Sequence, residues 1–284
     1  MPIAEFDLFI IGAGSGGVRA ARMAAQRGAR VAVAEMAALG GTCVNLGCIP
    51  KKLYSFAAHY AESFEESQGY GWQGSAPVLD WHRLKTNRAR EITRLNNIYA
   101  SMLHSAGVAV MHGRATLAAA DAVEVNGTTY RAKNILISTG GWPRLPDVPG
   151  RELVISSNEI FDLPEFPRRL VVVGGGYIAC EFASIFQGLG SQVTQLYRGE
   201  QVLRGFDDEV RHFVAAEMRK KGVDLRIRSD VSRIERSDGR LNVSLQQGEP
   251  LLTQLRGYLA APQPQAALLV TLAAIGMLLS FARL

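Results

Sequence analysis

The fold is decided by a stretch near the start of the chain, Phe6-Asp7-Leu8-Phe9-Ile10-Ile11-Gly12-Ala13-Gly14-Ser15-Gly16-Gly17. Its first half is a short apolar run with β-branched members, which predicts a strand. The glycine cluster leads into a helical pattern over residues 18–27, which Gly28 ends, and residues 31–35 predict the next strand. Because a strand, a helix and a strand follow in this order, we expect parallel pairing with a right-handed crossover.

The glycines of this turn have the spacing of a dinucleotide-binding fingerprint, with Gly12, Gly14 and Gly17 at its three positions. The first makes the tight turn, the second lets the backbone approach a pyrophosphate, and the third lets the helix pack on the strand. Glu35 ends the next strand, where a carboxylate can accept hydrogen bonds from ribose hydroxyls. These features predict a dinucleotide site, and a glycine-rich turn in another kind of α/β protein is the alternative.

A second unit of the same kind begins with the apolar run 170–173 and continues with Gly174-Gly175-Gly176-Tyr177-Ile178-Ala179. Alanine replaces the third glycine, which is an allowed variant. The following strand, 192–197, ends at a tyrosine instead of an acid, and Arg198 and Arg204 come next. Losing the carboxylate and gaining arginines favours a 2′-phosphate, hence NADP over NAD. Two solvated surface arginines are the alternative interpretation.

The rest of the chain supplies further elements and a boundary. Apolar residues at three- and four-residue steps predict a long helix over about 81–104, and a second helix is expected over about 207–221. Asn126-Gly127 is a hairpin signal. Residues 134–138 predict a buried strand, and the proline-rich stretch 142–168 predicts a domain boundary.

The chain has three cysteines, two of which stand close together in residues 40–52. Cys43 and Cys48 have a spacing that could close a disulfide on one helical turn. A zinc site is disfavoured because no second pair of cysteine or histidine residues lies at ligand spacing, so we expect no metal. Two buried cysteines without a role remain the alternative to catalytic redox chemistry. Cys180 lies inside a predicted helix and is interpreted as a core residue.

Composition excludes some classes of function. The chain is 48% hydrophobic, 20% charged and carries a net charge of +5, without a basic run that contains aromatic residues, so nucleic-acid binding is not expected.

The first residues lack the basic and apolar regions of a signal peptide, which favours a cytoplasmic location. Residues 266–282 form an uncharged apolar run. Its length is near the lower limit of about 17 residues for a membrane span, so we expect a helix that could tether the chain to a membrane.

The stretch Gly40-Gly41-Thr42-Cys43-Val44-Asn45-Leu46-Gly47-Cys48-Ile49-Pro50-Lys51-Lys52 resembles the redox signature of the pyridine nucleotide–disulfide oxidoreductase family. The resemblance runs in order from residue 5 to about 249 and includes residues 138–141 and 176–181. Within the family, residues 196–200 and the following arginine resemble the glutathione reductase branch. Mercuric reductases and dihydrolipoamide dehydrogenases are the alternatives, and the arginine pair disfavours the latter, NAD-linked branch.

The resemblance implies an α/β fold with two FAD/NAD(P)-binding Rossmann-like domains, both incomplete, and a C-terminal apolar helix. We expect an FAD-binding domain with the redox disulfide at 1–165, an NADPH-binding domain at 166–250 and an unrelated tail at 251–284.

The resemblance also implies the binding sites. FAD would be held by Gly12, Gly14, Ser15, Gly16, Gly17, Glu35, Thr42, Cys43, Lys51, Ala115, Thr139 and Gly140. NADPH would be held by Gly174, Gly175, Gly176, Ile178, Glu181, Arg198 and Arg204. Oxidised glutathione would contact Ser15, Arg22 and Tyr99.

In the catalytic cycle that the resemblance implies, hydride passes from NADPH to the flavin, and electrons then reduce the Cys43–Cys48 disulfide. Cys43 would attack the disulfide substrate, while Cys48 would contact the flavin. Lys51 and Glu181 would form an ion pair beside the flavin, and Tyr177 would act as a lid over it.

Members of the family continue with a second FAD segment and with an interface domain that builds a homodimer and donates a catalytic histidine across it. The sequence as it stands has no counterpart of these parts, so we expect impaired turnover from this chain. A nucleotide-binding fragment and a membrane-tethered module, both without turnover, are the alternative hypotheses.

Overall fold

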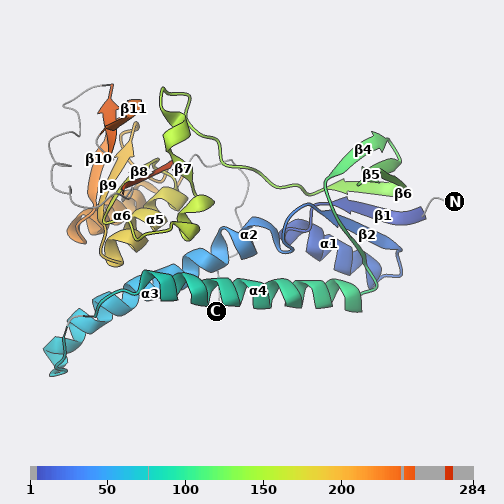
Figure 1. The fold of residues 1–284 in the computed structure, drawn as a ribbon, viewed down its shortest axis with the longest axis horizontal. Coiled ribbons are helices and arrows are strands. Elements are labelled where there is room, and N and C mark those ends of the chain that lie inside the picture. Colours follow the sequence, from blue (N-terminus) through green and yellow to red (C-terminus); the bar gives the residue numbers. More distant parts are fainter. Residues whose placement is uncertain (1–4, 76, 238–239, 247–265, 271–284) are drawn as a thin grey trace. The chain divides into compact units, whose positions relative to one another are not determined.

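The computed structural model describes residues 5–75, 77–237, 240–246 and 266–270 of the chain (Figure 1). The chain divides into two compact units, one formed by residues 1–53 and 83–141 and the other by residues 54–82 and 142–284. Each unit contains its own main sheet.

The first unit contains a six-stranded sheet in the order β3-β2-β1-β6-β5-β4. Its strands are β1 (Glu5–Ile11), β2 (Val31–Glu35), β3 (Ala109–His112), β4 (Ala115–Ala119), β5 (Ala122–Val125) and β6 (Thr128–Ile137). β1 pairs in parallel with β2 and β6, and β2 pairs in parallel with β3. Helix α1 (Ser15–Ala25) connects β1 to β2 and lies beside them in Figure 1, which confirms the predicted parallel crossover.

The central strands β1 and β2 bury side chains on both faces of this sheet, because successive side chains of a strand point to opposite sides. Ile10 and Val33 belong to one buried cluster together with residues of α1, whereas Phe9 and Ala32 belong to a second. The first cluster comprises Ile10, Ala13, Val18, Ala21, Val31, Val33, Leu39, Leu103 and Val108. The glycine turn after β1 therefore begins from a strand that is buried on both sides.

Two local predictions for this unit are confirmed. The long helix α4 covers Trp81–Ser105, close to the predicted 81–104. Asn126 and Gly127, with φ of 52° and 77°, connect the antiparallel strands β5 and β6. Two residues with positive φ are what a tight hairpin turn requires.

The predicted burial of residues 134–138 is wrong at the end of β6. Leu136 is 36% exposed and Ile137 is 60% exposed. Apolar composition correctly indicated a strand, but it does not determine whether another element covers each of its side chains.

Three further helices lie between β2 and α4 along the chain. They are α2 (Gly41–Asn45), α3 (Cys48–Ser67) and the short 3₁₀ helix η1 (Gln68–Tyr70).

The second unit contains a parallel sheet in the order β10-β9-β8-β13-β7 and a separate hairpin. The sheet consists of β7 (Ile155–Ser156), β8 (Arg169–Val173), β9 (Gln192–Tyr197), β10 (Asp224–Ile227) and β13 (Ala266–Val270). The hairpin pairs β11 (Val231–Ser237) with β12 (Arg240–Leu245). The helices of this unit are α5 (Tyr177–Gly188), α6 (Asp208–Lys220) and the 3₁₀ turns η2 (Arg151–Leu153) and η3 (Glu159–Asp162).

An aromatic cluster packs in the core of the second unit. Tyr54, Trp81 and Phe182 each lie within ring-contact distance of another member, with Phe161 at 5.5 Å from Tyr54 and 5.3 Å from Phe182. The Tyr54 hydroxyl donates to the Phe161 carbonyl at 2.8 Å, and the Trp81 indole donates to the Leu163 carbonyl at 2.9 Å. The two polar atoms are thus satisfied, which lets these rings be buried at little cost.

The start of the C-terminal apolar run departs from the expected helix. Residues 266–270 form strand β13, which pairs in parallel with β8 on one side and β7 on the other. An apolar run of this length suits a central parallel strand as well as a helix, and pairing partners decide between them. The remainder of the run, 271–282, lies outside the described residues. None of the helices in the described part of the chain combines the length and the hydropathy that a membrane span needs.

Candidate functional site

The first glycine turn leaves no room for side chains at two of its positions. Gly12 has φ of 103°, and a Cβ there would overlap the Ser138 carbonyl. A Cβ on Gly17 would overlap the Gly12 carbonyl oxygen and lie 3.2 Å from Ile10 Cγ2. These contacts place the start of α1 directly on β1, as the fingerprint predicts.

The open side of this turn is formed by the first residues of α1. Gly14 is the N-cap residue, and Ser15 and Gly16 are exposed. The first N–H groups of a helix have no intrahelical acceptor, and they carry the positive end of the helix dipole. The turn can therefore bind a pyrophosphate, and the space at Gly14 and Gly16 lets the anion approach the backbone.

Glu35 is fastened beside the same turn. Its Oε2 accepts a hydrogen bond from the Ala13 N–H at 2.7 Å, and its Oε1 accepts one from the Ala37 N–H at 2.9 Å. The carboxylate is half-buried at the carboxyl end of β2. It is thus held where a nucleotide ribose on the glycine turn could donate to its remaining lone pairs.

Cys43 and Cys48 form a disulfide with their Cα atoms 4.5 Å apart. The expectation that they share one helical turn is wrong, because Cys43 lies on α2 and Cys48 begins α3. Leu46 ends α2 by donating to the Thr42 carbonyl at 2.8 Å, and Gly47 follows before the new helix starts. The break between the helices lets the two side chains point toward each other.

The segment that carries Cys43 is anchored to the first glycine turn. The Gly40 N–H donates to the Ala13 carbonyl at 2.9 Å. A Cβ on Gly41 would lie 2.7 Å from Gly14 Cα, so the two backbones are in direct contact. The disulfide consequently belongs to a segment of the chain that contacts the first glycine turn, where the cofactor is predicted to bind.

Two asparagines, which the sequence reasoning missed, hold this segment in place. Asn45 Nδ2 donates to the carbonyls of Gly41 at 2.9 Å and Leu39 at 3.1 Å. Asn96, on α4, donates from Nδ2 to the Leu39 carbonyl at 2.8 Å and to Asn45 Oδ1 at 2.9 Å. Asn45 stands between the two cysteines in the sequence, but no pattern in the sequence indicated its partner 51 residues away.

A groove of about 610 Å³ lies between α1 and α4. Its lining residues are Arg22, Gln26, Arg94, Asn97, Ile98, Ser101, Met102, Ser105 and Ala106. Arg22, predicted to contact glutathione, thus borders an open space. Tyr99, predicted for the same role, is partly buried against the core cluster of the first unit.

Other predicted flavin contacts lie on elements of the first unit. Thr42 is part of α2, Lys51 of α3, and Ala115 begins β4. Thr139 and Gly140 follow the carboxyl end of β6, next to Ser138, which touches Gly12. Their approach to a flavin stays a prediction.

The second glycine turn repeats the construction of the first. Gly174 has φ of 142° and donates to the Leu196 carbonyl at 2.9 Å. The ring of Tyr197 fills the place that a Cβ on Gly175 would need. Gly176 is the N-cap residue of α5, so the first amides of that helix are available to a second dinucleotide.

The residues of α5 combine exposed and buried positions. Tyr177, the predicted lid, is the first residue of the helix and is 41% exposed. Ile178 and Glu181 are half-buried. Lys51 belongs to the first unit and Glu181 to the second, so their ion pair stays a prediction. Cys180 is a free, buried thiol whose pKa is raised by desolvation, as suits a core residue.

Arg198 and Arg204 are exposed, and neither guanidinium forms an ion pair with a carboxylate in the described part of the chain. The loop between them is fixed to its surroundings. The Leu203 N–H donates to the Gly175 carbonyl at 2.6 Å, and the Arg228 N–H donates to the Gly199 carbonyl at 3.0 Å. Both arginines are therefore available to an anion beside the second glycine turn.

Two glycine turns, each opening a helix after a parallel strand, and a disulfide held against the first define a flavoprotein-type disulfide reductase architecture. Residues 6–261 match the family described as pyridine nucleotide-disulphide oxidoreductase, and the chain belongs to this family. The match continues past residue 249, near which we expected the resemblance to end.

Among curated relatives, the chain is similar to a glutathione reductase of Burkholderia cepacia, with 50% identity over 247 residues. That alignment covers 87% of this chain and 55% of the relative. A chloroplastic/mitochondrial glutathione reductase of Pisum sativum is 46% identical, with 86% of this chain and 46% of the relative covered. The chain thus spans about half the length of these relatives.

A solved structure of similar fold is the Cu(II) complex of a HOCl-induced flavoprotein disulfide reductase from Escherichia coli. The TM-score is 0.79 at 26% identity, and the alignment covers 95% of this chain and 56% of that protein.

Proposed function

We propose that the chain supplies the nucleotide-binding and redox-disulfide parts of a flavin-dependent, NADPH-linked reductase of oxidised glutathione. The observation that carries this proposal is the closed Cys43–Cys48 disulfide on a segment whose Gly41 touches Gly14 of the first glycine turn. Electron transfer to a disulfide requires the cofactor and the sulfur atoms to be close neighbours. The similarity to glutathione reductases supports the choice of substrate.

The first glycine turn fits FAD. Gly12 and Gly17 have no space for a Cβ, while Ser15 and Gly16 are exposed, so the pyrophosphate would rest on the first amides of α1. Glu35 would accept hydrogen bonds from the adenosine ribose. When bound, FAD supplies the two-electron chemistry that connects NADPH to the disulfide.

The second glycine turn fits NADPH. Its pyrophosphate would lie at the N-terminus of α5, where Gly176 is the N-cap residue. Arg198 and Arg204 would bind the 2′-phosphate, because guanidinium groups bind phosphate oxygens in a planar, bidentate geometry. An NAD-linked function, as in dihydrolipoamide dehydrogenases, gives no reason for this pair of cations.

The chemistry at the cysteines is a two-step thiol–disulfide exchange. After two electrons and two protons open the Cys43–Cys48 disulfide, the Cys43 thiolate attacks one sulfur of oxidised glutathione. A mixed disulfide forms and one glutathione thiolate leaves, taking up a proton. The Cys48 thiolate then attacks the Cys43 sulfur, which releases the second glutathione and closes the intrachain disulfide again.

Further roles in this proposal follow the resemblance. Lys51 and Glu181 would form an ion pair beside the flavin, Tyr177 would cover it, and Arg22 would bind a glutathione carboxylate from the groove that it lines. The cytoplasmic location expected from the sequence belongs to the same proposal.

A trapping experiment tests the exchange chemistry directly. In Cys48→Ser the intrachain disulfide cannot form, so Cys43 should react with oxidised glutathione and stay as a stable mixed disulfide. Intact-mass and peptide mass spectrometry should find one glutathionyl group, located on Cys43. Cys180→Ser in the same background is the matched control and should leave the adduct unchanged, because Cys180 is buried.

Two results would contradict the proposal. The first is the absence of an adduct on Cys43 in folded Cys48→Ser protein. The second is a wild-type disulfide that NADPH and added FAD do not reduce while dithiothreitol does, as measured by thiol titration.

A further inference from the structure

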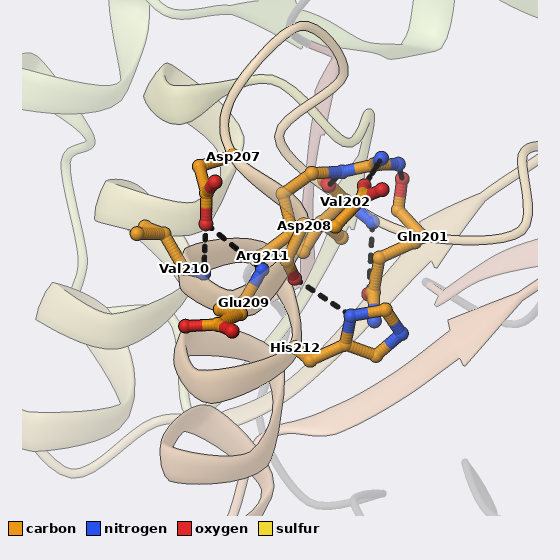
Figure 2. A network of polar contacts seen from close by, with 8 residues as sticks. All are labelled: Gln201, Val202, Asp207, Asp208, Glu209, Val210, Arg211 and His212. Atoms are coloured by element: carbon orange, nitrogen blue, oxygen red, sulfur yellow. Dashed lines mark hydrogen bonds and ion pairs between the residues drawn. The ribbon is translucent and has the colours of Figure 1, made fainter.

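The Arg211 side chain, on α6, makes hydrogen bonds to three acceptors (Figure 2). Its Nε donates to the Val202 carbonyl at 2.9 Å and its Nη2 donates to the Gln201 carbonyl at 3.0 Å. Its Nη1 donates to Asp208 Oδ1 at 2.6 Å. The side chain is only 20% exposed, so a planar fork is held between two backbone carbonyls and one carboxylate.

The two carbonyls belong to the loop between Arg198 and Arg204. Val202 is fully buried, and Leu203 adopts a left-handed backbone conformation with φ of 58°. A bulky apolar residue such as leucine adopts this conformation only at a cost in free energy, so surrounding contacts must maintain it. The Leu203 N–H donates to the Gly175 carbonyl, the Leu203 carbonyl accepts from the Phe206 N–H, and the fork of Arg211 holds the two residues before Leu203.

Hydrogen bonds at the start of α6 hold the first turn of the helix that carries Arg211. Asp207 is the N-cap residue, and its Oδ1 accepts from the N–H groups of Glu209 at 3.0 Å and Val210 at 3.2 Å. The His212 Nδ1–H donates to the Asp208 carbonyl at 2.7 Å (Figure 2). Because the first turn of the helix is capped, Arg211 connects a rigid element to the loop.

We propose that Arg211 is a positioning residue that sets the preference of this chain for NADPH over NADH. This inference rests on the proposed function, in which Arg198 and Arg204 bind the 2′-phosphate. Arg211 acts through the loop: it holds the carbonyls of residues 201 and 202 and thereby the spacing between the two exposed guanidinium groups. A cation that merely adds positive potential would not need three directed hydrogen bonds.

The test separates the 2′-phosphate from the rest of the nucleotide. Binding of 2′,5′-ADP and of 5′-AMP to the full chain is measured by calorimetry. The readout is the dissociation constant of 5′-AMP divided by that of 2′,5′-ADP, which is large when the 2′-phosphate contributes to binding. Arg211→Lys keeps the charge but replaces the fork by a single nitrogen. We expect this ratio to fall about tenfold, which corresponds to the loss of one well-formed charge-assisted phosphate contact. Binding of 5′-AMP should not change.

The control is Arg219→Lys. Arg219 lies on the same helix and donates to a backbone carbonyl, that of Leu225 at 3.3 Å, away from the loop. This variant should keep the wild-type ratio. Asp208→Asn weakens one acceptor while Arg211 remains, so it should lower the ratio less than Arg211→Lys does.

Each outcome has one meaning. An unchanged ratio in Arg211→Lys, or an equal loss of affinity for both nucleotides, would overturn the positioning role. A wild-type chain that binds 5′-AMP as tightly as 2′,5′-ADP would overturn the NADPH assignment itself and this inference with it. Arg198→Gln distinguishes the two cases, because it should lower the ratio whenever the NADPH assignment holds.

Discussion

Asn96 donates a hydrogen bond from its side-chain amide to Asn45 Oδ1 at 2.9 Å, and in this way connects α4 to the short helix that carries Cys43. The same amide nitrogen also donates to the Leu39 carbonyl at 2.8 Å. The segment that carries Cys43 is therefore held by hydrogen bonds from α4 and by contacts with the first glycine turn.

Replacing Asn96 by alanine should destabilise this segment. Asn45 Oδ1 would lose its donor, while the Leu39 carbonyl would keep only the hydrogen bond from Asn45 Nδ2. An acceptor left unsatisfied in this way costs about 1–3 kcal/mol. Urea denaturation of the oxidised chain should show this decrease in the free energy of unfolding. Asn97→Ala, at the exposed neighbouring position, is the control, and equal stability of both variants would contradict the role assigned to Asn96.

Two glycines in one turn should respond differently to alanine. Gly17→Ala would place a Cβ into the Gly12 carbonyl, so we expect a loss of more than about 2 kcal/mol and of FAD binding. Gly16→Ala meets no atom of the described chain within 4 Å and should leave the stability unchanged or raise it slightly. Thermal unfolding followed by circular dichroism measures both, and a stable Gly17→Ala protein would rule out the close contact.

The aromatic cluster of the second unit should be sensitive to truncation. Phe161→Ala would leave a cavity beside Tyr54 and Phe182, with an expected cost of about 3–5 kcal/mol. Tyr54→Phe removes only the hydroxyl that donates to Phe161 and should cost about 1–2 kcal/mol. Tyr60→Ala, on the same helix but 75% exposed, should be nearly neutral in the same urea titration.

Asp7 should make stability depend on pH in the acid range. A hydrogen bond from Lys133, and then one from the Arg30 N–H, lower the pKa of Asp7 from 3.8 to about 2. Because folding lowers this pKa, the stabilisation is present above the unfolded value and disappears as the pH falls from about 4 to about 2. Asp7→Asn should therefore differ in stability from wild type at neutral pH but not near pH 2. A constant difference across this range would show that Asp7 contributes by another route.

Much of the fold could be predicted because its signals are local. The helix over 81–105, the hairpin at Asn126-Gly127 and the parallel crossover follow from apolar periodicity, turn residues and chain order. The cysteine pair was correctly interpreted as a disulfide, although the helix ends between the cysteines at Leu46. A helix end depends on which carbonyls and amides are satisfied nearby, and spacing alone does not contain that information.

Predictions about which side chains are buried and which elements pair with one another failed where the answer depended on residues distant in the sequence. Ile137 is exposed although it ends the apolar run 135–137, and residues 266–270 pair between β8 and β7 in place of forming a helix. Apolar runs are compatible with a helix, a buried strand or a half-covered strand. Only the neighbouring elements select among these states.

The sequence alone determined the two glycine turns, their helices, the acidic end of β2 and the redox cysteines, because each depends on the backbone freedom or chemistry of neighbouring residues. The tertiary structure alone decided that Asn96 supports the disulfide segment and that Arg211 holds the loop between Arg198 and Arg204. A side-chain amide or guanidinium can donate to many carbonyls, and the packing of whole helices chooses which of them come within hydrogen-bonding distance.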